Sequence, residues 1–378
     1  MRIKDIILFC LLSVLFSSCN QAYSPLTNGA YLGEAVNENL KKVTIQETGA
    51  ETSVYVALAS PVEYEVKARV GINPEVLLSY NKKHGTNYKV LPAEYYNLSN
   101  DECVVKPGEL SSSLVNINIK AFDDKLEPSE KYAIPLELQE VSGVDILQPS
   151  SSMVLLCDKI IVTKVLYSAA GGATGASPTM SYEVKDGEAP IEDLLNWTIE
   201  FLVYNESFSL NRHILRFDGL DGKANTFARF GQHSFPENQF QLTLLNLPIH
   251  AVTLCENKKW YHVAITCDGA SIKLYLNGEL DVVASHPEPN TKITWQKLAF
   301  AIGNPGALSE ARIWNVTRSQ AEIANNMYAV NPQSEGLISY WKMNDGSGNI
   351  IHDYTDNGRD MKLLRSCTWK EEKFPPEQ

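Results

Sequence analysis

Apolar and polar residues alternate with a period of two in several short segments of the first half of the chain. Residues 54–58, 64–70 and 114–120 each place their apolar side chains on one side of the backbone, as expected of strands with one buried face. One segment differs, because Pro74 is typical of the first position of a helix, and no breaker follows it before Gly85. The pattern predicts an antiparallel β-sandwich with one short helix.

The second half of the chain is also rich in predicted strands. Residues 197–203, 261–266 and 272–276 have the composition of strands. Asn277-Gly278 follows the last of them and favours a type I′ hairpin, because both central residues of that turn need a positive φ. Evenly spaced strands with such turns predict a second sandwich, of the jelly-roll type.

Tryptophan and histidine residues are unevenly divided along the chain. All six Trp lie at or beyond position 197, and six of the seven His lie beyond position 200. The 378 residues are enough for two domains of ~100–200 residues each, and a Gly-rich segment near residues 168–175 is the predicted seam. We therefore expect a first sandwich over residues 35–165, a linker over 166–179 and a second sandwich over 180–378.

Charge and cysteine content exclude several classes of function. The formal net charge is −12 and the chain has no Lys/Arg-rich run, which argues against nucleic acid as a partner, since phosphate neutralisation dominates binding there. The chain has seven Cys, two of them near the N-terminus. The other five are far apart, so neither a disulfide framework nor a zinc site of CxxC spacing is predicted.

The N-terminus has the pattern of an export signal. Basic residues precede an apolar run over residues 6–16, which is too short to span a hydrocarbon core of ~30 Å. Two serines directly before Cys19 resemble the lipobox of bacterial lipoproteins. The resemblance implies a signal peptide over residues 1–18, lipidation of Cys19, a linker over 19–34 and anchoring in the outer membrane, with the membrane face left open. The alternative is an ordinary export signal that contains a cysteine by chance.

Residues 78–88 and 132–136 carry a second resemblance. Their sequence motifs LSYNKKHGTNY and YAIPL are similar to those of the Bacteroidetes family known as domain of unknown function 1735. The similarity covers about residues 35–160. It implies an immunoglobulin-like sandwich that precedes a varied C-terminal module in lipoproteins of glycan utilisation.

The second half resembles the laminin-G, concanavalin A-like lectin family. Residues 260–269 and 273–279 correspond to its most recognisable hairpin, residues 311–315 to the following strand, and residues 336–349 to its closing strand. These sequence motifs occur in the same order as in the family, over about residues 180–365. The resemblance implies a jelly-roll sandwich, but this fold supports many functions.

Acidic residues offer little support for catalysis. Glucanases of this fold carry two acids on one strand face in a Glu-x-Asp-x-x-Glu run, which is not found in the sequence. Asp218 and Asp221 flank glycines in a predicted turn, and with Asn304 and Glu310 they are candidate oxygen ligands for Ca²⁺. Calcium is the one candidate cofactor.

Sugar binding requires an aromatic ring beside polar side chains, because a sugar has an apolar C–H face and a rim of hydroxyls. Residues 227–235 mix aromatic residues with Arg, Gln and His. The candidate ligand-binding residues are Tyr204, Arg229, Gln232, His233 and Trp295.

The sequence thus favours a non-catalytic, lipid-anchored protein of the cell envelope that binds a glycan. Its expected partners are a poly- or oligosaccharide, the membrane through the lipid anchor, and other envelope proteins of glycan uptake. Two alternatives remain: a protein-interaction or adhesin module, and a glycoside hydrolase with an unrecognised acid pair.

Overall fold

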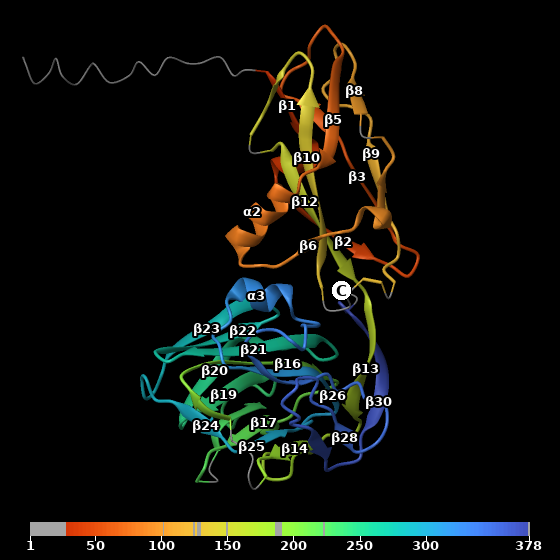
Figure 1. Cartoon of the computed structure of the whole chain (residues 1–378). Coiled ribbons are helices and arrows are strands. Elements are labelled where there is room, and N and C mark those ends of the chain that lie inside the picture. Colours follow the sequence, from red (N-terminus) through yellow and green to blue (C-terminus); the bar gives the residue numbers. More distant parts are fainter. Residues whose placement is uncertain are drawn as a thin grey trace, which may run out of the picture.

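The computed structural model describes residues 28–100, 102–123, 125–126, 130–148, 150–185, 191–221 and 224–376. They form two β-sandwiches that follow one another along the chain (Figure 1), which confirms the all-β prediction. The predicted signal peptide, Cys19 and residues 20–27 of the first predicted linker lie outside the described residues. Within the described part, no helix combines the length and the apolar character needed to cross a membrane.

The first sandwich packs a large sheet against two small ones. The large sheet has the order β2 (Leu40–Ile45), β12 (Ser152–Lys159), β10 (Tyr132–Val141), β5 (Val66–Ile72) and β8 (Glu102–Val105), with β6 (Lys89–Val90) paired to β10. The small sheets are β11 (Asp145–Ile146), β1 (Gly29–Leu32) and β4 (Val56–Leu58), and β3 (Ala50–Val54), β9 (Val115–Ile119) and β7 (Tyr96–Leu98). Two short 3₁₀ helices, η1 (Gly33–Val36) and η2 (Ala93–Tyr95), complete this domain. Fully buried side chains such as Val70, Leu136 and Ile117 join the sheets in one core.

Helix α2 (Pro74–His84) begins and ends as its sequence predicts. The Asn73 side chain accepts a hydrogen bond from the backbone N–H of Glu75, which satisfies one of the free donors of the first turn. Gly85 closes the helix in the left-handed conformation with φ 63°, which glycine adopts without steric cost.

The second sandwich consists of two large sheets. The first, which we call the interdomain sheet, has the order β23 (Glu279–Ser285), β22 (Ser271–Leu276), β21 (Trp260–Asp268), β16 (Asn196–Asn205), β26 (Gly306–Trp314), β13 (Ile161–Ser168) and β30 (Thr368–Phe374), with β27 (Leu337–Trp341) paired to β26. The second, the distal sheet, has the order β20 (Leu247–Leu254), β19 (Gln239–Leu244), β18 (Ala224–Phe230), β17 (Arg212–Asp218), β25 (Lys297–Phe300), β14 (Met180–Glu183), β29 (Met361–Leu363) and β28 (Ile350–Ile351). A small pair, β15 (Ile191–Leu194) and β24 (Ile293–Trp295), and helix α3 (Gln320–Asn325) complete the domain.

The interdomain sheet faces the first sandwich. Figure 1 shows α3 on that side of the second domain. A cavity of about 380 Å³ lies between the domains, lined by Tyr88 and Lys131 of the first and by Asn325 and Tyr328 of the second. The distal sheet is on the opposite side, away from the first domain (Figure 1).

The domain boundary differs from the prediction. Strand β13, predicted to fall mostly within the first sandwich, pairs with β26 and β30 of the second, so the boundary lies near Ile160 rather than at residue 165. At the other end, β1 already belongs to the first sandwich before residue 35.

The core of the second domain lies between its two large sheets. Phe217, Phe230 and Phe240 of the distal sheet have no exposed surface, and Phe240 contacts Phe201 of the interdomain sheet at a ring distance of 6.3 Å. Since successive side chains of a strand point to opposite faces, the residues directly next to these phenylalanines in their strands point to the outer face of the distal sheet.

Candidate functional site

The outer face of the distal sheet carries a row of polar side chains across four strands. The register places His213 of β17 opposite Arg229 of β18, Arg229 opposite Gln241 of β19, and Gln241 opposite His250 of β20. Each has a core residue as a neighbour in sequence, so strand alternation turns these side chains away from the core. We call these four residues the polar row.

Arg229 is the centre of the polar row. Its Nε donates to Gln241 Oε1 at 2.6 Å, and its Nη1 donates to Asn211 Oδ1. Both acceptors are neutral amides, and within the described chain no carboxylate lies at ion-pair distance from Arg229. Burial lowers the pKa of its guanidinium, but an arginine stays protonated in proteins. At Arg229 the face therefore carries a positive charge that no acidic side chain of the described residues balances.

The two histidines of the row are neutral at pH 7. Burial lowers the pKa of His213, and the charges of Arg229 and Arg216 lower it further. Burial, followed by the charge of Arg229, lowers the pKa of His250. A neutral imidazole offers one N–H donor and one acceptor nitrogen, which suits hydroxyl groups.

Two aromatic rings lie beside the polar row. Phe227, half-buried on β18, is stacked near His213 at a ring distance of 6.0 Å, and Arg229 lies over it at 5.6 Å from the ring centre. Phe235, which is 40% exposed in the loop before β19, is stacked on His250 at 3.9 Å. The face thus combines apolar rings with hydrogen-bonding groups.

Several polar atoms at this end of the distal sheet are buried without a hydrogen-bond partner among the described residues. They are Arg212 Nε, His213 Nδ1, Gln232 Oε1, Gln239 Oε1 and His250 Nδ1. An unsatisfied buried polar group costs about 1–3 kcal/mol, so these atoms would gain from hydrogen bonds to a polar ligand or to solvent.

Three of the five predicted ligand-binding residues lie in this region and two do not. Arg229 belongs to the polar row, and Gln232 and His233 lie in the loop that carries Phe235. The prediction for Trp295 as an exposed platform is wrong, because its side chain has no exposed surface and its Nε1 donates to Asn225 Oδ1 at 3.0 Å.

Tyr204 lies on the other sheet. It belongs to β16 and packs on Trp260 at a ring distance of 5.5 Å, on the outer side of the interdomain sheet. One continuous site cannot contain both Tyr204 and Arg229, because the sandwich core separates them.

The four predicted calcium ligands are placed differently from one another. Asp218 is the last residue of β17 and accepts a hydrogen bond from Arg216 of the same strand at 2.7 Å. Asp221 is exposed in the following turn. Asn304 is fully buried and accepts a backbone N–H at 3.1 Å. Glu310 lies on β26 of the other sheet and is bound by Arg312. In the described residues, no three His, Cys, Asp or Glu side chains come together in a geometry for a metal. Glu310 is therefore not available to an ion near Asp218.

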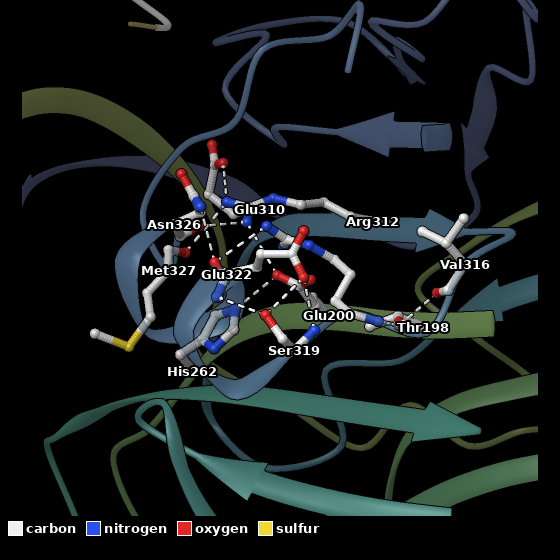
Figure 2. Close-up of polar contacts among 11 residues, drawn as sticks. Thr198, Glu200, His262, Glu310, Arg312, Val316, Ser319, Glu322, Asn326 and Met327 are labelled. Atoms are coloured by element: carbon white, nitrogen blue, oxygen red, sulfur yellow. Dashed lines mark hydrogen bonds and ion pairs between the residues drawn. The ribbon is translucent and has the colours of Figure 1, made fainter. Parts of the chain in front are cut away.

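A buried charge network lies on the other side of the domain, between the interdomain sheet and α3 (Figure 2). Glu200 Oε2 accepts from Arg312 Nη1 at 3.2 Å, and Glu200 Oε1 accepts from Arg318 Nη1. His262 Nε2 lies 3.3 Å from the same carboxylate. Burial alone would raise the pKa of the Glu200 carboxyl, but Arg318, His262 and Arg312 hold this pKa well below its usual range.

The two arginines also fix the segment around α3. Arg312 donates to the backbone oxygens of Asn326 and Met327 at 2.6 and 3.1 Å, and Arg318 donates to that of Glu322 at 3.1 Å. These bonds satisfy carbonyl groups at the end of a short helix. The network therefore attaches α3 and the following segment to the sheet.

The network does not have the properties of a hydrolase site. Arg312 binds both Glu200 and Glu310. The exposed fractions of these two residues are only 0% and 6%. A glycosidase needs two carboxyl groups that reach the scissile bond, whereas these two are closed to a substrate. Their role is structural.

Acid is expected to destabilise the second domain through Glu200. Its pKa is below the usual value in the folded state and about 4.3 in the unfolded state, so below about pH 4 unfolding takes up a proton. The stabilisation is therefore present above about pH 5 and is lost as the pH falls. All six Trp belong to the second domain, so urea unfolding followed by Trp fluorescence reports on it. A Glu200→Gln variant with an equally steep loss of stability in acid would contradict this assignment.

The residues that sequence analysis missed are His213, Gln241 and His250. Gln241 and His250 lie in alternating strand segments, which was the available signal, whereas His213 lies at a register shift that interrupts the alternation. Their proximity to Arg229 depends on the register of β17 to β20, which no local pattern reveals.

The second domain has the fold of a concanavalin A-like lectin. Residues 184–324 match the protein-family model described as the concanavalin A-like lectin/glucanases superfamily. Residues 21–145 match a separate model, described as an N-terminal domain. No match to a curated protein is found.

Among solved structures, the chain is similar to a protein of Bacteroides ovatus ATCC 8483 that is provisionally named a carbohydrate binding protein. The two are 20% identical with a TM-score of 0.52, over 90% of this chain and 97% of that one. A product complex of EndoBT-3987 from Bacteroides thetaiotamicron is 22% identical with a TM-score of 0.29, over 34% of this chain and 30% of that one. At 20% identity the similarity to the Bacteroides ovatus protein concerns the fold alone.

Proposed function

We propose that this protein is a non-catalytic glycan-binding lipoprotein of the cell envelope, and that the outer face of its distal sheet is the glycan site. The observation that carries the proposal is the polar row with Phe227 and Phe235 beside it. The concanavalin A-like fold and the similarity to a protein provisionally named as carbohydrate-binding support it at the level of the domain.

The chemistry of this face matches that of a sugar. Phe235 is exposed and Phe227 half-exposed, so both rings can contact the C–H face of a pyranose. His213 and His250, which are partly exposed, provide planar groups that donate and accept hydrogen bonds. Gln241 is only 2% exposed and orients Arg229 from beneath. The buried unpaired atoms of Gln232 and Gln239 would gain partners from ring hydroxyls.

The arrangement of the chain suits a binding role at a membrane. The proposed lipid anchor at Cys19 precedes the first sandwich, which would act as a spacer. The distal sheet lies on the side of the second domain that faces away from the first (Figure 1). A glycan could therefore be held there for neighbouring enzymes, without bond cleavage by this chain.

A glycan array with the chain lacking its predicted signal tests the proposal. We expect binding to at least one plant, microbial or host glycan. Replacing Phe227 by Ala is expected to weaken binding roughly tenfold, because a lost ring contact of about 1.4 kcal/mol corresponds to that factor.

The matched control is Tyr64→Ala, which removes a ring that is 48% exposed on the first domain. This variant should bind as the unmodified chain does. Absence of binding across the array at millimolar ligand, or an equal effect of both substitutions, would overturn the proposed function.

A further inference from the structure

The charges on the distal face are unevenly balanced. Arg216 is neutralised by Asp218, whose Oδ1 lies 2.7 Å from its Nε. Arg229 contacts the amides of Gln241 and Asn211 instead. These amides orient the guanidinium but leave its charge unbalanced.

The acidic groups near this face do not compensate Arg229. Glu237, in the loop before β19, is exposed and has no ion pair within the described chain. Asp281 lies beyond the edge of the polar row and accepts hydrogen bonds from the backbone N–H groups of Val252 and Thr253 at 2.7 and 2.9 Å. A partly buried cation without a counter-charge is costly, and an anionic ligand would remove that cost.

The geometry of Arg229 leaves suitable donors free. A guanidinium has five N–H donors, and the protein uses one on Nε and one on Nη1. One hydrogen on Nη1 and two on Nη2 remain without an acceptor in the described chain, and N–H donors of this kind bind a carboxylate. Because Gln241 and Asn211 hold the plane of the group, little conformational freedom is lost on binding.

We propose that the glycan bound by the distal face is acidic, and that the guanidinium of Arg229 binds the carboxylate of a uronate or similar sugar acid. This inference rests on the proposed function and adds the class of ligand. The net charge of the chain is −12, so an unbalanced cation on this face is a local feature that would select an acidic sugar rather than attract polyanions in general.

The test compares each acidic oligosaccharide with its carboxyl-reduced form. We would use fragments of polygalacturonate, alginate and hyaluronan, with sulfated dermatan fragments as a separate arm, on the chain without its predicted signal. We expect at least one uronate to bind, and its reduced form to bind roughly ten- to a hundredfold more weakly, as for the loss of a hydrogen bond to a charged group.

Two variants test the role of Arg229. Arg229→Gln should abolish the preference for the acid, and Gln241→Glu should do the same by placing a carboxylate against the arginine. Lys362→Gln is the control, since it removes the positive charge of an exposed side chain on β29 of the same sheet, and it should keep the preference. Thermal unfolding of each variant verifies that the domain is folded.

The outcomes distinguish the two proposals. Binding of a neutral glycan that depends on Phe227 but not on Arg229 would overturn the acidic-ligand inference alone. Equal binding of acid and reduced forms, or binding of sulfated fragments alone, would overturn it too. Absence of any glycan binding would overturn the proposed function itself.

Discussion

Replacing Glu200 by glutamine is expected to destabilise the second domain by about 3–5 kcal/mol, the usual effect of removing one partner from a buried ion pair. The carboxylate is fully buried and contacts both Arg312 and Arg318. Glutamine has nearly the same shape but no charge, so two buried guanidinium groups would lose their shared counter-charge. Urea unfolding followed by Trp fluorescence measures the difference.

The control for this prediction is Glu256→Gln. Glu256 forms an ion pair with Lys259 at 2.8 Å, and both side chains are more than half exposed. An exposed pair of this kind contributes about 0–1 kcal/mol. Similar losses for the two variants would show that the Glu200 network does not attach α3 to the sheet.

Replacing Trp295 by alanine is expected to cost about 3–5 kcal/mol, as for other large aromatic side chains removed from a core. Its ring lies 5.4 Å from that of Trp197 and 5.1 Å from that of Phe217, and it has no exposed surface. The substitution leaves a cavity that these rigid neighbours cannot fill. Urea unfolding followed by the remaining tryptophans measures the loss.

Trp295→Phe separates stability from binding. It retains a ring in the core, so the domain stays folded, and glycan affinity should remain within about twofold because the side chain does not reach the surface. A selective loss of glycan binding in this folded variant would restore Trp295 as part of the site.

Local chemistry explains what could be predicted from the sequence. Helix α2 ends at Gly85 and the β22–β23 hairpin turns at Asn277-Gly278, with φ values of 51° and 80°, because each conformation is determined by the residues within it. The predicted boundary at residue 165 was wrong, because β13 would show the same alternation of apolar and polar residues in either domain. Its partner β30 lies near the end of the chain, and a strand's sequence does not identify a distant partner.

Only the part of the candidate site that a local sequence pattern indicates could be predicted. Arg229 belongs to a segment that combines aromatic and polar residues, so it could be selected from sequence. His213 and His250 join it only through the pairing of four strands. Trp295 follows a Pro- and Asn-containing loop, but its burial depends on residues from three other strands, which local sequence does not reveal.

A crystal structure of the chain with a glycan that it binds tests the central claim most directly. We predict that the sugar lies on the outer face of the distal sheet, with one ring against Phe227 or Phe235 and polar contacts to Arg229 and to His213 or His250. A sugar bound in the cavity between the domains, or on the interdomain sheet beside Tyr204, would contradict the account.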